Sequence, residues 1–202
     1  AFTTTRDGRT MGVWRTNADG AKAVQVTTGN GEFLTDVSPD GRWIYFNRTP
    51  ERTVWRAPMQ RGEAERLDDS TLMWMVRVSP DGKSIAHPWL IRSGDQEELS
   101  LAVSPAEGGN PTWTHSWPRG EWTSGSGWEV EWARDGKALS YIANTGAVGN
   151  IWLQPLDQSP PRQITHFDEM RAFSHAWSLD GRTLYVVRGK SISDAVLISN
   201  FH

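Results

Sequence analysis

The sequence contains no cysteine. Disulfide bonds, thiolate nucleophiles and cysteine-ligated zinc sites are therefore excluded together. Long apolar runs are also missing, because no stretch approaches the roughly 18 residues that a membrane-spanning helix needs. The net charge of −3 provides no basic surface for nucleic acid. We therefore expect neither a membrane segment nor nucleic-acid binding by this domain.

One tetrapeptide turn recurs along the chain, at Ser38–Gly41, Ser79–Gly82, Ala133–Gly136 and Ser178–Gly181. In its Ser-Pro-Asp-Gly form, proline sets φ for the second position, aspartate caps the turn, and glycine accepts the positive φ that follows. Apolar or aromatic residues alternate before each turn, and β-branched or aromatic residues follow it. Each turn therefore predicts a tight hairpin between two strands.

A third and a fourth strand follow each hairpin, and no segment has a convincing helical stripe. A four-stranded unit of about 40 residues, repeated, is typical of β-propeller blades. The predicted fold class is all-β: a β-propeller of four-stranded antiparallel blades, about five blades' worth and incomplete at both ends. Its single domain, 1–202, divides into a partial blade 1–27, blades 32–68, 71–114 and 128–165, and a partial blade 172–199.

The Ser-Pro-Asp-Gly turn, the β-run after it and the following Val/Ile-Trp strand resemble the TolB-like family of propeller repeats. The tail from Ser193 to Phe201 also resembles the C-terminus of bacterial multidomain proteins in which a propeller follows a winged-helix regulator or a serine/threonine kinase domain. The resemblance implies a propeller fold and says little about function. Residue 1 falls inside a repeat, so we expect room for a signal or a further domain upstream, and we favour a periplasmic or extracytoplasmic location.

The two ends of a blade differ in their connections. The first-to-second and third-to-fourth turns are short, whereas the insertions Pro88–Glu97, His115–Gly127 and Asn144–Gly149 collect at the opposite end. Loops carry function on rigid scaffolds, so this loop-rich end is the predicted binding face. Incomplete terminal blades leave open edges, which makes a homo-oligomer through these edges a further expectation.

Twelve tryptophans are unusual for this length. Most recur at matched repeat positions together with Phe33 and Phe173, and we expect such aromatics to form the core between blades. Trp89, Trp117 and Trp122 match no repeat. With Arg119 they make the loop-rich end a candidate binding surface, because tryptophan and arginine are enriched at binding hot spots. The alternative is that this loop folds back over the channel mouth.

Charged residues fall on the first strands, which usually line a propeller channel. Asp36, Arg77 and Glu131 align, and Glu129 lies two positions before Glu131. Pairing of opposite charges is the favoured interpretation, and a cation site is the alternative.

No sequence pattern indicates an active site. The segment most similar to a nucleophile elbow, Ser124–Gly127, has the wrong spacing. The five histidines do not have the spacing of metal ligands, and no glycine-rich loop precedes a helix. We therefore expect no cofactor and no catalysis.

The favoured function is a non-catalytic binding module for a protein, peptide or small ligand within a larger bacterial protein. The alternatives are a propeller associated with a peptidase or hydrolase domain, and a lyase or hydrolase that uses the four channel residues.

Overall fold

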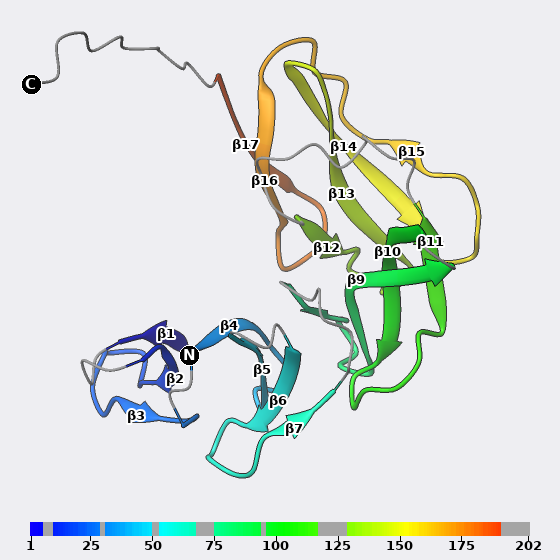
Figure 1. Cartoon of the computed structure of the whole chain (residues 1–202). Helices are drawn as coiled ribbons and strands as arrows, with labels where there is room; N and C mark the ends of the chain where they lie inside the picture. The colour runs from blue at the N-terminus through cyan, green and yellow to red at the C-terminus, as the bar shows by residue number, and fades with distance from the viewer. Residues whose placement is uncertain are drawn as a thin grey trace, which may run out of the picture.

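All regular secondary structure in the described part of the chain is β-strand. The computed structural model describes residues 1–5, 10–28, 31–49, 53–67, 75–93, 96–116 and 129–190, and Figure 1 shows five separate antiparallel sheets in chain order. The predicted all-β class is confirmed.

Three of the sheets have four strands each, always ordered as a simple meander. The second sheet contains β4 (Glu32–Val37), β5 (Trp43–Arg48), β6 (Thr53–Pro58) and β7 (Glu65–Arg66). The third contains β8 (Arg77–Val78), β9 (Ser84–Ser93), β10 (Gln96–Pro105) and β11 (Trp113–Ser116). The fourth contains β12 (Val130–Trp132), β13 (Ala138–Thr145), β14 (Val148–Pro155) and β15 (Arg162–Gln163).

The two terminal sheets are smaller within the described ranges. The first sheet contains β1 (Phe2–Thr4), β2 (Gly12–Arg15) and β3 (Val24–Gln25), and the fifth contains β16 (Arg171–Trp177) and β17 (Leu184–Gly189). The third strand expected near residues 195–198 lies outside the described residues.

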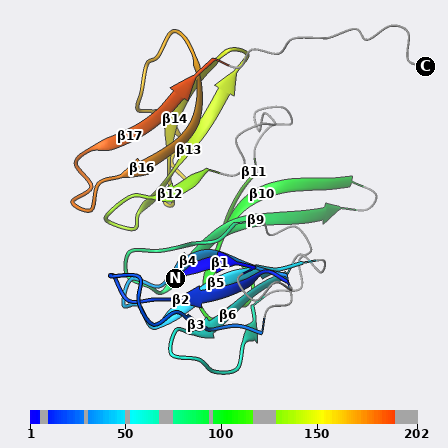
Figure 2. The same ribbon diagram turned by 90° about the vertical axis from the view of Figure 1, so that its left-hand side faces the viewer.

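The sheets follow one another around an arc. The first strands of neighbouring sheets are in contact, from β4 to β8, β8 to β12 and β12 to β16. In Figures 1 and 2 the first and fifth sheets lie at opposite ends of this arc. Radial contact of first strands is the arrangement of a propeller, so the predicted fold is confirmed over a stacked solenoid.

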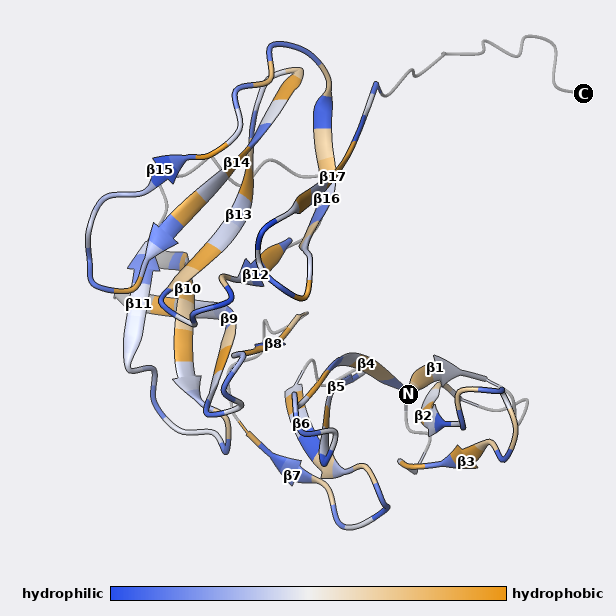
Figure 3. Cartoon of the chain, turned by 180° about the vertical axis from the view of Figure 1, so that it is seen from behind, coloured by the Kyte–Doolittle hydropathy of each residue, from blue (hydrophilic) through white to orange (hydrophobic). Residues whose placement is uncertain are grey.

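The hydrophobic core lies between sheets. One cluster joins Val13 and Val26 of the first sheet to Ile44 and Phe46 of the second, and two similar clusters join the second sheet to the third and the third to the fourth. Hydrophobic and hydrophilic residues alternate along β10, β13 and β14 in Figure 3. The third sheet uses both faces, because Ile85 packs with the second sheet and the neighbouring Ala86 packs with the fourth.

The repeat-matched tryptophans lie mainly in these clusters. Trp113 and Trp132 are buried, and Trp43, Trp55 and Trp152 pack against the clusters. Their predicted place in the inter-blade core is confirmed, whereas Trp74 and Trp128 lie outside the described residues.

The same expectation is wrong for Phe33, whose side chain is 40% exposed. The ladder between β4 and β5 has a register shift between Leu34 and Asp36. Such an irregularity changes which face the residues before it occupy. Leu34 consequently packs on the core cluster, Glu32 is fully buried, and Phe33 faces outward.

Two predicted insertions are strands rather than loops. Pro88–Ser93 extends β9 and pairs with the start of β10 as far as Ser93↔Gln96. Asn144–Gly149 is a continuation of the β13–β14 hairpin, whose last pair is Thr145↔Val148. Both segments continue the pairing of their hairpin, and in the β13–β14 hairpin the ladder extends to the turn at Gly146 and Ala147. The expectation of loops at these two places is wrong, and residues 117–127 lie outside the described residues.

The recurring turn is held by one hydrogen-bond pattern. In the first turn, the Ser38 hydroxyl donates to Asp40 at 2.6 Å and accepts from the Trp43 amide at 2.9 Å, while Asp40 accepts from the Arg42 amide at 3.0 Å. These hydrogen bonds to the charged form, with the Ser38 hydroxyl contributing most, lower the pKa of Asp40 to about 2. The turns at Ser79 and Ser178 repeat the pattern. At Ala133 the aspartate still accepts from Lys137, but the hydroxyl is missing.

Replacing Ala133 by serine is expected to complete this turn. The new hydroxyl can donate to Asp135 and accept from the Ala138 amide, which should raise the free energy of unfolding by about 1 kcal/mol. Urea denaturation of Ala133→Ser beside wild type measures the change, and Ser79→Ala is the matched control, expected to lower stability by a similar amount. Equal or lower stability of Ala133→Ser would contradict this account of the turn.

Candidate functional site

Three charged residues lie at one level of the central axis. Asp36, Arg77 and Glu131 pair across their hairpins with Tyr45, Ala86 and Ser140, which are equivalent positions of the repeat. The equivalent residue of the fifth sheet is Ala176, paired with Tyr185. The row of charges therefore crosses three sheets and ends at the fifth.

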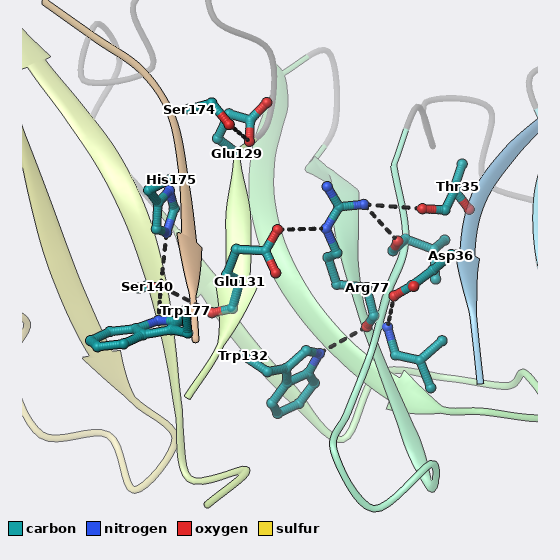
Figure 4. A network of polar contacts seen from close by, with 12 residues as sticks. Thr35, Asp36, Arg77, Glu129, Glu131, Trp132, Ser140, Ser174, His175 and Trp177 are labelled. Atoms are coloured by element: carbon teal, nitrogen blue, oxygen red, sulfur yellow. Dashed lines mark hydrogen bonds and ion pairs between the residues drawn. The ribbon is translucent and has the colours of Figure 1, made fainter. Parts of the chain in front are cut away.

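Arg77 connects the three sheets (Figure 4). Its Nε donates to Glu131 Oε1 at 3.0 Å, and its Nη1 donates to the Thr35 carbonyl at 3.1 Å. Asp36 accepts from the Val78 amide at 2.7 Å and from its neighbour Val37 at 2.8 Å. These groups contact each other and the backbone of adjacent sheets. Among the described residues, no group of three or more histidine, aspartate or glutamate side chains could hold a metal ion.

Burial dominates the electrostatics of the two acids. It raises the pKa of Asp36 against the opposing effects of the Val78 and Val37 amides and of Arg77. Burial also raises the pKa of Glu131, and the charge and hydrogen bond of Arg77 oppose this rise. Glu129, the fourth predicted channel residue, is placed differently, since it accepts a hydrogen bond from Ser174 of the fifth sheet at 3.3 Å. The structure thus brings three of the four predicted residues together.

A second polar group joins the fourth and fifth sheets, and sequence reasoning did not identify it. Ser140 Oγ lies 2.8 Å from His175 Nε2, accepts from Trp177 Nε1 at 2.9 Å and donates to the Glu131 carbonyl at 3.2 Å (Figure 4). A hydroxyl has one proton and two acceptor sites, so the histidine must donate from Nε2. Nδ1 is then a bare acceptor, and it is buried without a partner among the described residues.

This arrangement does not activate the serine. Ser140 is fully buried, and its only proton is already directed to a backbone carbonyl. Burial lowers the pKa of His175 to about 4, so the ring is neutral near pH 7. A weak sequence signal did exist: His175 stands where Thr35, Val76 and Val130 stand in the preceding repeats, and Ser140 stands where Tyr45 and Ala86 stand. A histidine and a serine at two buried positions of neighbouring sheets are consistent with a direct contact.

The buried histidine should make stability depend on pH. The unfolded chain takes up a proton near pH 6.5, whereas the folded chain takes it up only near pH 4. Stability is therefore complete above pH 6.5 and falls as the pH drops to about 4, by about 3 kcal/mol for this group. Urea denaturation at a series of pH values measures the loss. His175→Val should have a smaller loss over this window, and an unchanged pH profile in that variant would assign the dependence to other groups.

A pocket of about 440 Å³ opens beside Arg77 between the second and third sheets. Its walls are Phe33, Leu34, Thr35, Asn47, Thr49, Met75 and Arg77. Phe33 and Thr49 lie where β4 begins and β5 ends, away from the Ser38 turn, so the pocket is at the predicted binding end of the sheets. Arg77 Nη2 has no hydrogen-bond partner among the described residues. The pocket therefore combines an apolar wall with one available cationic donor.

The residues predicted to bind from the loop-rich end are only partly described. Trp89 is half-buried within β9, where its ring meets the His87 ring edge-on with centroids 5.9 Å apart. It belongs to a strand rather than to a loop. Trp117, Arg119 and Trp122 lie outside the described residues, so their role stays a prediction. In the described ranges, no helix is long and apolar enough to cross a membrane.

Comparison with known proteins gives a consistent fold. No protein-family model matches the chain. An uncharacterized protein of Agrobacterium fabrum is 27% identical over 144 residues, which is 64% of this chain and 46% of that protein. The solved structure of a putative TolB from Agrobacterium tumefaciens is 24% identical with a TM-score of 0.59, and covers 87% of this chain and 62% of its own.

Two further structures support this likeness. TolB from Acinetobacter baumannii has a TM-score of 0.67 at 17% identity, covering 91% of this chain and 44% of its own. The β-propeller domain of the Trilobed protease from Pyrococcus furiosus, described as having an open velcro topology, has a TM-score of 0.55 at 13% identity over 94% of this chain and 64% of its own. The chain is structurally similar to TolB-like β-propellers and spans less than two thirds of each of these relatives.

Proposed function

We propose that this chain is a non-catalytic binding module that takes an extended protein or peptide segment at the pocket beside Arg77. The observation that carries the proposal is the pocket itself. An apolar wall meets the Arg77 side chain there, and its Nη2 has no hydrogen-bond partner in the described ranges, while Asp36 and Glu131 are already bonded.

The exposed aromatic ring favours a binding role. Phe33 is turned outward by an irregularity in β4, although its repeat position predicts burial. Because Phe33 is 40% exposed, it forgoes about 1 kcal/mol of the burial energy of a fully buried ring. A partner that covers the ring recovers part of this energy, and aromatic residues and arginine are enriched at interfaces.

The guanidinium defines the chemistry of the partner. Arg77 is held by Glu131 and the Thr35 carbonyl, so Nη2 is fixed in place before any ligand arrives. A rigid donor costs less entropy to engage than a mobile one. The best ligand is therefore a segment that offers an apolar side chain to Phe33 and Met75 together with a carboxylate or carbonyl oxygen for Arg77.

The serine–histidine contacts favour a non-catalytic role. Ser104 lies 2.8 Å from His87 and Ser140 lies 2.8 Å from His175, and all four residues are buried. A nucleophile must reach its substrate, so these pairs are better explained as polar links within the core. The alternative with channel acids as catalysts is weakened in the same way, because Asp36 and Glu131 are engaged by the backbone and by Arg77.

A peptidase-associated propeller is the second candidate. Solved acylaminoacyl peptidase from Pyrococcus horikoshii matches with a TM-score of 0.61 at 13% identity, and the match covers 32% of that chain. In this candidate the same pocket would contact a peptide on its way to a neighbouring domain.

Selection of displayed peptides tests the proposal. A phage library of random heptapeptides, panned on the immobilised chain, should yield sequences that combine an apolar residue with aspartate or glutamate. Synthetic forms of the enriched peptides should bind Phe33→Ser about tenfold more weakly than wild type, measured by calorimetry, because the apolar wall is lost.

Leu179→Ser is the matched control. Leu179 is 90% exposed in the Ser178 turn, at the opposite end of the sheets, so this variant should bind as wild type does. Failure to enrich any sequence, or equal weakening in both variants, would refute binding at this pocket. Cleavage of the selected peptides by the chain alone would refute the non-catalytic assignment.

A further inference from the structure

A second pocket lies at the turn end of the sheets, opposite the Arg77 pocket. It has a volume of about 590 Å³ and lies between the third and fourth sheets, both of which have four strands. The recurring turns of these two sheets line it through Ser79–Asp81 and Arg134–Gly136. We call it the turn pocket. Its volume is within the range of about 300–1,000 Å³ that is usual for small-molecule sites.

The turn of the fourth sheet departs from the repeat at this pocket. Its first two residues are Ala133 and Arg134, where the other three turns have serine first and proline or leucine second. Without the serine hydroxyl, Asp135 accepts one hydrogen bond in the described ranges, from the Lys137 amide to Oδ1 at 3.0 Å. Oδ2 of Asp135 therefore has no donor within the part of the chain that the structure describes.

The other carboxylate of the turn pocket also has an oxygen to offer. Oδ1 of Asp81 accepts from the Ser79 hydroxyl at 2.6 Å and from the Lys83 amide at 3.0 Å, whereas Oδ2 accepts from no described residue. In the first turn, by contrast, Arg42 Nε donates to Asp40 Oδ2 at 2.6 Å. The hydrogen bonds to Oδ1, that from Ser79 most of all, lower the pKa of Asp81. Asp81 is therefore an anion at neutral pH.

Arg134 adds a cationic donor to the same pocket. It is exposed, and its guanidinium has no hydrogen bond or ion pair with any residue in the described ranges. The stem of the side chain lies against the turn of the fifth sheet, since a Cβ atom added at Gly181 would be 2.6 Å from Arg134 Cβ. Glycine is needed there for this close approach as well as for its φ of 70°. The stem is thus packed while the head group stays available.

The charges of the turn pocket define the class of its ligand. Two carboxylates and one guanidinium give a net charge of −1, which disfavours an anion, and a simple cation would leave the guanidinium without a partner. Hydroxyl groups satisfy both, because each can donate to a carboxylate oxygen or accept from the guanidinium. Trp113 and Trp132, each 8% exposed, add apolar wall for the C–H groups of a sugar ring. We propose that the turn pocket binds a neutral saccharide.

A printed array of neutral and acidic oligosaccharides, probed with the biotinylated chain on streptavidin, tests the proposal. Neutral oligosaccharides should be bound, and the one bound most strongly is then titrated by calorimetry. Arg134→Pro gives the fourth turn the proline that the first two turns have at this position, so the fold should be kept while the guanidinium is lost. The variant should bind the saccharide at least about tenfold more weakly.

Two further variants sharpen this experiment. Asp135→Asn keeps an oxygen for the Lys137 amide but replaces the second acceptor by a donor, so it should also weaken binding about tenfold. Leu179→Pro is the matched control, because it makes the same kind of change at the equivalent position of the fifth sheet, outside the turn pocket. It should bind as wild type does.

Four results would overturn the proposal: no neutral oligosaccharide bound, binding confined to acidic ones, equal affinity of Arg134→Pro and wild type, or equal loss in Arg134→Pro and Leu179→Pro. The turn pocket and the Arg77 pocket share no residue and lie at opposite ends of the sheets. Saccharide should therefore not displace the selected peptides, and failure of either proposal leaves the other untouched.

Discussion

The packing of one sheet face on the next is the interaction on which this structure depends. A single four-stranded sheet of this size has too little apolar surface to be stable alone. Side chains alternate along β5, so that Ile44 and Phe46 pack on the first sheet while Tyr45 packs on the third. Stability is therefore shared between adjacent sheets, and each sheet orders the next. The hairpin turns fix register, but they bury little themselves.

The contact between the fourth and fifth sheets differs from the others. Each of the first three interfaces contains an apolar cluster, whereas the fourth–fifth interface has Ser140, His175 and Trp177 in a hydrogen-bonded group, and Asn144 bonds both backbone groups of Ala172. Polar core groups are directional, so they specify one relative position more strictly than apolar packing does. They also make this interface sensitive to acid, because burial opposes protonation of His175.

The repeat made the architecture predictable, and departures from the repeat limited the prediction. The four Asp-Gly turns and the alternation around them were sufficient for the propeller class, and the matched tryptophans located much of the inter-sheet core. Phe33 was misplaced because a ladder irregularity leaves no trace in residue type. The strands at 88–93 and 144–149 were misread because Pro88 and the Asn-Thr-Gly sequence at 144–146 favour loops, although the hairpin pairing continues through both segments. His175 and Ser140 gave only a weak sequence signal, since the aligned positions hold Thr35 and Tyr45 as well as valine and alanine.

Repeated side-chain positions form the scaffold, and the proposed binding pocket contains a residue that departs from the repeat. A side chain at a position that recurs in every repeat packs on or bonds to a neighbouring sheet, as Trp132 does through its 2.8 Å hydrogen bond to the Arg77 carbonyl. A side chain that does not pack on a neighbouring sheet remains exposed at the surface. The register shift in β4 leaves Phe33 partly exposed. The bonds of Arg77 to Glu131 and Thr35 use Nε and Nη1, and not Nη2. The two meet in one pocket, because Arg77 follows β4 directly around the axis. The proposed binding pocket therefore lies where the repeat is broken, next to a place where it is kept.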